Sequence, residues 1–222
     1  MTVGVVVPAA GAGVRFGGAT PKALALLAGE PLLVHALRAL RAAPSVDTVV
    51  VAAPAEHLDA VRLLLAAYDV LVVAGGSTRQ DSVGLALAAL PAEVDLVLVH
   101  DAARCLTPVP VIERVVAALR SGAQAVVPAL TVVDTMKRVD EGGLVVATVD
   151  RTDLRIIQTP QGFAREVLAR AHAAGLDPLT DDAGLVELLG VPVLTVPGSD
   201  EAFKITRPQD LLLAGAVLAA RS

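Results

Sequence analysis

The sequence predicts an α/β fold in which helices cover both faces of a doubly wound, mostly parallel, Rossmann-like sheet. Apolar runs rich in valine alternate with helical patterns, and the connections between them are short. Hydrophobic residues make up 55% of the chain but aromatic residues only 2%, so alanine, valine and leucine must build the core. Such a core is typical of parallel strands packed under helices rich in alanine and leucine.

The individual elements follow from the alternation of apolar periods along the chain. We expect strands at residues 3–7, 48–52, 70–73, 96–99, 125–127, 156–158 and 193–196. Helices are expected at 32–41, 55–67, 81–90, 109–121, 165–173, 182–189 and 209–220. Because such sheets bind ligands outside the carboxyl ends of their strands, the loops that follow the strands are the place to look for a site.

One segment, residues 131–153, interrupts the alternation. Two β-type runs, 132–139 and 144–149, flank the sequence Asp-Glu-Gly-Gly, which is a hairpin turn signal. An isolated hairpin is marginal in water, so this one must pack on something. We therefore expect residues 1–222 to form one domain with a protruding β-hairpin arm that packs against a second subunit.

The stretch at residues 7–22, VPAAGAGVRFGGATPK, predicts a phosphate-binding loop. It follows an apolar run directly, and its glycines let backbone N–H groups approach an anion while Arg15 and Lys22 neutralise it. Phe16 stands where a dinucleotide fingerprint needs its third glycine, and Lys22 follows Pro21 where a Walker loop needs glycine. The loop is thus typical of a triphosphate clamp; the alternative is a plain glycine-rich connection.

Two further loops carry polar residues directly after apolar runs. In residues 75–82, GGSTRQDS, the glycines allow a ligand to approach, and Ser82 with the loop amides could bind a nucleobase edge. Arg79 would hold this loop by ion pairing. The alternative is a simple strand-to-helix turn in which Ser77 or Thr78 caps the helix.

In residues 100–104, HDAAR, Asp101 is placed to hold Mg²⁺, which prefers one or two carboxylates together with substrate phosphates. The alternative is an aspartate that caps the turn and pairs with Arg104; that arginine could instead meet a second phosphate. Lys204, which precedes a helix started by proline, either extends to solvent or points into a site. Residues 180–182, Thr-Asp-Asp, are typical of a helix N-terminus or contact a second substrate.

Several side chains are expected to carry no chemistry. We expect a structural role for His100, a solvent-facing position for His35, His57 and His172, and a role as a small apolar filler for Cys105. The single cysteine excludes an internal disulfide and a cysteine-rich metal site. A formal charge of −5 without a Lys/Arg block disfavours nucleic-acid binding. With no apolar run of membrane-spanning length and no basic N-terminal region, a cytoplasmic location is expected.

Taken together, the motifs resemble those of the 2-C-methyl-D-erythritol 4-phosphate cytidylyltransferases, enzymes of the isoprenoid pathway that does not use mevalonate. The resemblance rests on VPAAGAGVRFGGATPK, AGGSTRQDSV, VHDAAR, VDTMKRV, TVDR, QTPQGF, TDDAGLVE and FKITRPQDL, which cover essentially the whole chain in order. It implies a fold of the nucleotidyltransferase type and a Mg²⁺-dependent reaction of CTP with methylerythritol phosphate that gives the CDP-alcohol and pyrophosphate. The attacking phosphate is already an anion, so the reaction needs fixed cations and no general base.

The resemblance also implies residue roles. Arg15, Lys22 and Lys204 would be the catalytic cations, and Asp101 would hold Mg²⁺. Nucleotide binding would fall to Ala10, Gly11, Ala12, Gly13, Gly75, Gly76, Ser77, Ser82 and Ala102. The polyol phosphate would contact Arg104, Thr135, Arg151, Thr159 and Thr180. The hairpin would be a dimerisation arm that carries Thr135 and Arg151 into the neighbouring active site, so that a homodimer shares its sites.

Departures from the family pattern are few, and alternatives stay open. Cys105 stands where many members have proline, and Ala23 where many have glutamine, which affects only local loop conformation. A ribitol 5-phosphate cytidylyltransferase shares the chemistry with another acceptor, and a sugar-1-phosphate nucleotidyltransferase would use another nucleotide. A non-catalytic nucleotide-binding regulator is disfavoured, because it would be expected to lose one or more of the charged residues that this chain retains.

Overall fold

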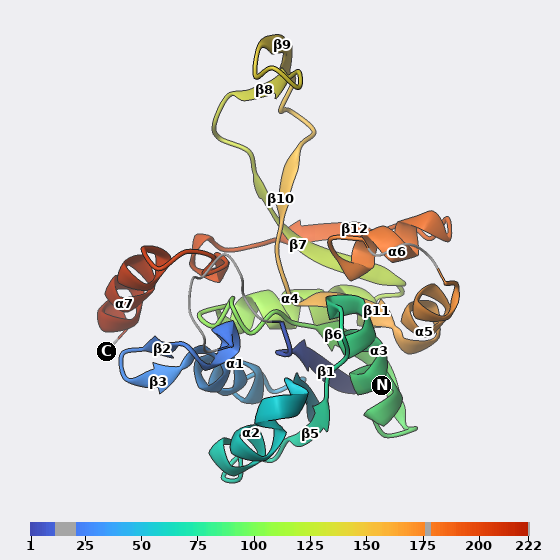
Figure 1. Ribbon diagram of the computed structural model, residues 1–222. Coiled ribbons are helices and arrows are strands. Elements are labelled where there is room, and N and C mark those ends of the chain that lie inside the picture. Colours follow the sequence, from blue (N-terminus) through green and yellow to red (C-terminus); the bar gives the residue numbers. More distant parts are fainter. Residues whose placement is uncertain (12–20, 176–178, 222) are drawn as a thin grey trace.

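The protein is built around one twisted sheet with helices on both faces (Figure 1). The computed structural model describes residues 1–11, 21–175 and 179–221. The strands lie in the order β10-β7-β11-β6-β1-β4-β5, with β12 also paired to β7. Their bounds are β1 (Thr2–Pro8), β4 (Thr48–Ala53), β5 (Leu71–Ala74), β6 (Val94–Val99), β7 (Ala125–Thr131), β10 (Arg155–Ile157), β11 (Gln161–Ala164) and β12 (Leu194–Pro197).

The sheet is mostly parallel, as the sequence predicts. The pairs β1–β4, β1–β6, β4–β5 and β12–β7 are parallel. The strand β11 runs antiparallel to both β6 and β7, so β6 and β7 share one direction, and β10 is antiparallel to β7. Sequence reasoning missed β11, because the segment Gln-Gly-Phe-Ala shows neither an apolar run nor a clear alternation.

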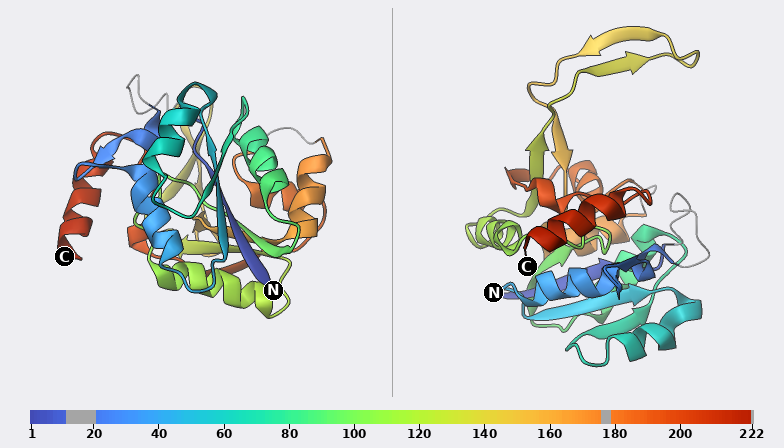
Figure 2. Two further views of the ribbon diagram at one scale, coloured as in Figure 1. Left: turned by 90° about the horizontal axis from the view of Figure 1, so that it is seen from below. Right: turned by 90° about the vertical axis from the view of Figure 1, so that its left-hand side faces the viewer.

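Helices cover both faces because the central strands are apolar on both sides. On one face, α1 (Leu32–Arg41), α2 (Leu58–Leu64) and α4 (Val109–Arg120) pack in a core with Val3, Val5 and Val7 of β1. On the other, α3 (Arg79–Ala89), α5 (Arg165–Ala173) and α6 (Asp182–Leu188) pack in a core with Val6. The left view of Figure 2 shows the sheet between these two layers of helices. Each of these helices was predicted, although 55–67 divides into η3 (Ala55–His57) and α2.

A third apolar cluster joins α7 (Asp210–Ala220) to β2 (Leu26–Leu27) outside the main sheet, where β2 pairs with β3 (Glu30–Pro31). Cys105 lies in this cluster, and burial raises the pKa of its thiol to about 12. The thiol therefore stays protonated and acts as the expected apolar filler. The remaining short helices are η2 (Lys22–Leu24) and η4 (Asp200–Ala202). No helix in the described part of the chain is long and apolar enough to cross a membrane.

The predicted arm is present and protrudes from the body. Its strands β8 (Met136–Val139) and β9 (Val145–Val149) form a separate antiparallel pair. The ends of β7 and β10 carry them well above the sheet (Figures 1 and 2). Val139, Leu144 and Val145 are each more than half exposed on this arm. Several exposed apolar side chains close together on a two-stranded hairpin are typical of an interaction surface.

Two histidines differ from the prediction that they face solvent. His35 is only 7% exposed, and its Nε2 lies 2.9 Å from the carbonyl oxygen of Leu27. The side chain of His172 is 9% exposed and hydrogen-bonds a buried carboxylate. Helical periodicity alone cannot predict this, because the partners come from other elements. His57 ends η3 and is partly exposed.

Candidate active site

The loops after β1, β5 and β6 meet at the carboxyl edge of the sheet and enclose a cavity of about 200 Å³. Its lining combines residues from the N-terminal loop, the start of α3, the turn after β6 and the segment before α7: Pro8, Ala9, Gly11, Lys22, Ala23, Arg79, Ser82, Asp101, Ala102, Ala103 and Lys204. The fold thus brings together predicted phosphate, nucleotide and metal residues that lie far apart in the sequence.

The glycine-rich loop is described only at its two ends. Gly11 and Lys22 line the cavity, and Lys22 opens η2 directly after Pro21. The predictions for Ala12, Gly13 and Arg15 fall on residues outside the described ranges. Ala10 lies against Gly75, where an added Cβ would approach the Cβ of Ala10 to 2.4 Å. This close packing explains why glycine is required at position 75.

The loop before α3 is a capped turn that also borders the cavity. Thr78 caps the helix, its Oγ1 accepting from the Asp81 N–H at 3.0 Å while the Asp81 carboxylate accepts from the Thr78 N–H at 3.0 Å. The buried Ser82 hydroxyl accepts from the Gly76 N–H at 3.1 Å and donates to the Thr78 carbonyl at 2.9 Å. The interpretation of Thr78 as a helix cap is therefore confirmed. The Ser82 hydroxyl thus holds the loop in place. Its predicted contact with a nucleobase stays a prediction.

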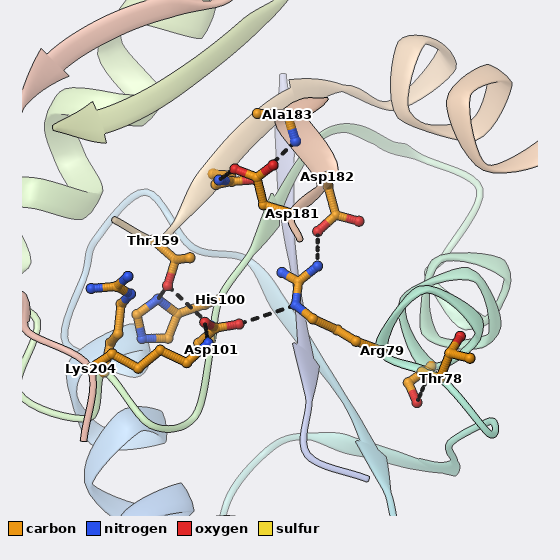
Figure 3. Close-up of polar contacts among 12 residues, drawn as sticks. Thr78, Arg79, His100, Asp101, Thr159, Asp181, Asp182, Ala183 and Lys204 are labelled. Atoms are coloured by element: carbon orange, nitrogen blue, oxygen red, sulfur yellow. Dashed lines mark hydrogen bonds and ion pairs between the residues drawn. The ribbon is translucent and has the colours of Figure 1, made fainter. Parts of the chain in front are cut away.

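Asp101 lies at the centre of the site, just beyond β6 (Figure 3). Its Oδ2 accepts from Lys204 Nζ at 2.6 Å, and its Oδ1 accepts from Arg79 Nε at 3.4 Å. Burial alone would raise the pKa of Asp101, but the charges of Arg79 and Lys204 outweigh it and hold the pKa well below its usual range. The carboxylate is thus ionised, and its ion-pair partners are Lys204 and Arg79, not Arg104 as in the alternative interpretation.

Arg79 joins Asp101 to a second carboxylate that sequence reasoning missed. Its Nη1 donates to Asp182 Oδ2 at 2.6 Å, and the other oxygen of Asp182 accepts from His172 Nε2 at 2.9 Å (Figure 3 shows the Arg79–Asp182 contact). The sequence indicated an ion-pairing role for Arg79 and a helix N-terminus at 180–182. No local signal could have paired residues that are 103 positions apart.

A second cavity, of about 260 Å³, continues from the first. The two share Arg79, Asp101 and Lys204, and the second is also lined by Arg104, Thr159 and Thr180, which were predicted to contact the polyol phosphate. Gln158, Gln161 and Asp181 line it without having been predicted. Thr135 and Arg151 are exposed at the base of the arm and line neither cavity.

Arg104 and His100 hold the walls of this second cavity. Arg104 donates to the carbonyl oxygens of Ala202 at 2.8 Å and Ile157 at 3.1 Å, and burial lowers its pKa. His100 is fully buried with Nδ1 3.1 Å from Thr159 Oγ1, and burial lowers its pKa to about 4. The imidazole is therefore neutral, in agreement with the structural role expected for it.

The described residues suit a metal that arrives with its phosphate ligands. Within these ranges, no group of three or more His, Cys, Asp or Glu side chains could hold a metal by itself. One ionised carboxylate, Asp101, faces both cavities. Mg²⁺ commonly takes one or two carboxylates and completes its shell with phosphates and water. The donor set therefore fits Mg²⁺ delivered as a nucleotide complex.

Comparisons with known proteins point to one family. The model of the 2-C-methyl-D-erythritol 4-phosphate cytidylyltransferase family matches residues 3–220. The chain is 53% identical to the enzyme of that name from Streptomyces avermitilis, over 97% of this chain and 91% of the relative. It is 55% identical to the one from Saccharopolyspora erythraea, over 99% and 100%.

Solved structures agree with these sequence matches. The crystal structure of the enzyme of that name from Thermus thermophilus superposes with a TM-score of 0.79 at 40% identity, covering 99% of this chain and 100% of that one. The structure of 4-diphosphocytidyl-2C-methyl-D-erythritol synthase from Anaerococcus prevotii superposes with a TM-score of 0.85 at 27% identity, covering 98% and 96%.

Proposed function

The chain belongs to the 2-C-methyl-D-erythritol 4-phosphate cytidylyltransferase family, and we propose that it transfers the cytidylyl group of CTP to 2-C-methyl-D-erythritol 4-phosphate. The products are 4-diphosphocytidyl-2-C-methyl-D-erythritol and pyrophosphate, in the synthesis of isoprenoid precursors without mevalonate. One observation carries the proposal beyond family membership: a single ionised carboxylate, Asp101, is surrounded by cations where two cavities meet.

The reaction asks for charge neutralisation at phosphorus. An oxygen of the acceptor phosphate attacks the α-phosphorus of CTP, a new P–O bond forms, and the bond to the β-phosphate breaks with release of pyrophosphate. The nucleophile is already an anion, so no proton has to be removed. We propose that Arg15, Lys22 and Lys204 stabilise the negative charge that develops on the phosphates. Fixed cations of this kind lower the energy of a crowded, anionic transition state. His100 is fully buried and lines neither cavity, which agrees with a mechanism that lacks a general base.

Asp101 is the residue we assign to Mg²⁺. When bound, Mg²⁺ would neutralise phosphate oxygens and polarise the phosphorus centre. Each oxygen of Asp101 accepts from one cation and keeps a second lone pair for a metal, but the positive charges of Lys204 and Arg79 would oppose metal binding as long as both stay in place. The Lys204 ammonium is the nearer partner and sits on a flexible stem. We propose that it leaves Asp101 and turns to a phosphate oxygen when the nucleotide enters.

The cytosine and ribose are assigned to the first cavity and its rim. Backbone groups there would read the base by donors and acceptors, and the residues proposed are Ala10, Gly11, Ala12, Gly13, Gly75, Gly76, Ser77, Ser82 and Ala102. The positions of some of these residues support the assignment. Gly11, Ser82 and Ala102 line the cavity, and Ser82 holds the 75–77 loop beside it.

The acceptor phosphate is assigned to the second cavity and to a partner subunit. Arg104, Thr159 and Thr180 line that cavity, whereas Thr135 and Arg151 lie on the arm. We propose a homodimer in which the arm of one subunit delivers Thr135 and Arg151 to the active site of the other. The exposed apolar side chains on the arm support this, because burying them against a second copy would stabilise the dimer.

Pyrophosphate release with Mg²⁺ and CTP tests the proposed reaction. Methylerythritol phosphate should support rapid release, and ribitol 5-phosphate should support little. The reverse preference would keep the cytidylyl-transfer chemistry and assign the chain to ribitol 5-phosphate. Release with neither acceptor would contradict the proposal and favour a different nucleotide or a non-catalytic role.

A further inference from the structure

We propose that Asp182 and His172 are positioning residues that act on the active site through Arg79. Neither lines the two cavities of the site. The carboxylate of Asp182 is 1% exposed, and each of its two oxygens accepts a hydrogen bond. One oxygen accepts from Arg79 Nη1 at 2.6 Å and the other from His172 Nε2 at 2.9 Å. A carboxylate can only accept, so His172 must carry a proton on Nε2. The inference rests on the proposed function, because it concerns how Asp101 is presented to the metal–nucleotide complex.

Arg79 is held more firmly by Asp182 than by Asp101. The distance from Nη1 to Asp182 is 2.6 Å, whereas the distance from Nε to Asp101 is 3.4 Å, which is longer than an ordinary hydrogen bond. The guanidinium is planar and rigid, so fixing Nη1 also fixes where Nε lies. Asp182 therefore keeps Arg79 close enough to lower the pKa of Asp101, yet too far away to bind its Oδ1 tightly.

Asp182 is itself anchored by the chain on both sides. The preceding Asp181 caps α6 by accepting from the Gly184 N–H at 3.1 Å, and the following Ala183 donates its N–H to Gln161 Oε1 at 3.1 Å. Gln161 also donates from Nε2 to Asp181 at 2.7 Å. Figure 3 shows Asp181, Asp182 and Ala183 together with Arg79 and Asp101. The start of α6 is thus fixed to β11, in the middle of the sheet, and Asp182 has little freedom to follow Arg79.

His172 supplies the last contact of the chain of residues. It lies near the end of α5, which packs on the same face of the sheet as α3 and α6, and its side chain is 9% exposed. By donating to Oδ1 it leaves Oδ2 to Arg79 and prevents the carboxylate from turning. An outer residue that orients a carboxylate or its partner in this way commonly changes metal affinity by about 10- to 100-fold when it is removed.

The charge of Asp182 decides how available Asp101 is. Arg79 has a counter-ion of its own in Asp182, so it does not need Asp101 for neutralisation. In Asp182→Asn the guanidinium would keep its charge and lose that partner. It would then close on Asp101 Oδ1, and a metal would have to break this tighter pair. The substitution should therefore weaken binding of the metal and leave the contacts with the cytosine base unchanged.

The decisive experiment measures binding and turnover for Asp182→Asn. Calorimetric titration should give a dissociation constant for Mn²⁺·CTP about 10-fold or more above that of the unsubstituted protein, with kcat/KM for CTP reduced to match. In EDTA, where CTP binds without a metal, the change should stay below about 3-fold. Equal weakening with and without the metal would overturn the proposal, and so would unchanged Mn²⁺·CTP affinity.

Variants of His172 keep the test decisive if Asp182→Asn does not fold. Gln places an amide nitrogen near the position of Nε2, so His172→Gln should retain the Mn²⁺·CTP affinity, whereas His172→Leu removes the donor and should lose it. His35 is the matched control, with similar burial and an Nε2 contact outside both cavities. His35→Leu should lower thermal stability without changing the ratio of the two CTP affinities. Equal behaviour of the two His172 variants would contradict the positioning role.

The outcome is separable from that of the proposed reaction. Should the unsubstituted protein release no pyrophosphate with either acceptor, the proposed function fails. The comparison of CTP affinities with and without Mn²⁺ still decides whether Asp182 and His172 control Asp101, because it requires no turnover.

Discussion

Replacing Lys204 by methionine separates catalysis from stability at this site. The ammonium lies 2.6 Å from Asp101 Oδ2, borders both cavities and belongs to a side chain that is 36% exposed. Methionine keeps an unbranched apolar stem of similar length and removes only the charge. The substitution asks whether the charge of Lys204 contributes mainly to folding stability, by pairing with Asp101, or mainly to catalysis, by pairing with a phosphate.

The structure gives magnitudes for the two roles. At 2.6 Å and an effective dielectric constant near 20, the attraction to Asp101 is about 6 kcal/mol before desolvation. Desolvation offsets most of it, and solvent screens a side chain this exposed, so we expect a net loss of about 1 kcal/mol in the free energy of unfolding. That corresponds to a fall in Tm of about 2–4 °C for a chain of this size. Losing one fixed charge from a transition state costs about 10²- to 10³-fold in kcat.

The assay is pyrophosphate release at saturating CTP and methylerythritol phosphate, combined with thermal unfolding. Arg221→Met is the matched control, because Arg221 pairs with Glu201, is 35% exposed and lines neither cavity of the site. Both variants should lose similar stability, and only Lys204→Met should lose turnover. Near-normal kcat in Lys204→Met would refute the assignment of this cation to the transition state. A collapse of the fold would refute the estimate of its stability.

Further predictions concern other parts of the site. Asp101→Asn should weaken Mn²⁺·CTP binding by about 10-fold or more in equilibrium dialysis, while binding in EDTA persists. The pKa values of Asp101 and Asp182 lie below the usual value of about 3.9 in the folded state, so the stability that these groups confer is present above pH 4 and is lost as the pH falls below it. Urea unfolding between pH 5 and 2.5 should show this loss, and Asp101→Asn should reduce its slope. Gly75→Ala should lower the free energy of unfolding by about 1–3 kcal/mol, because its Cβ would collide with Ala10; an unchanged urea midpoint would contradict that packing. Mixed dimers of Arg151→Ala and Asp101→Ala should regain part of the activity that each variant lacks, and no recovery after proven subunit exchange would argue against shared sites.

The sheet and its helices could be predicted because their signals are local. The valine runs of β1 and β4 are buried on both faces, so each strand is a continuous apolar segment. The hairpin arm was predicted from its turn residues and from two runs that fit no helix. The strand β11 was missed because Gln161 and Gly162 occupy buried positions that composition would assign to a loop.

The site divides in the same way. Lys22 and Asp101 were singled out because one follows a proline and the other a strand end, whereas the assignment of Lys204 to the site rested on the family resemblance. Asp182 and His172 were not, because their importance lies in a contact made across the fold. A histidine on a helix carries no sign in the sequence that a carboxylate from the next helix will meet it.

The arrangement of charge suggests how the site can pair its cations within the protein and still bind a triphosphate. Lys204 and Arg79 are neutralised by Asp101 and Asp182, so each of these two cations already has a carboxylate partner in the protein. An incoming polyphosphate can replace Asp101 as the partner of Lys204, and the freed carboxylate oxygen can then serve a metal. The exchange conserves the number of ion pairs, which keeps its cost low because no charge is left without a partner. It works only if Arg79 does not take over the freed oxygen, and the fixed contact between Arg79 and Asp182 is what prevents this.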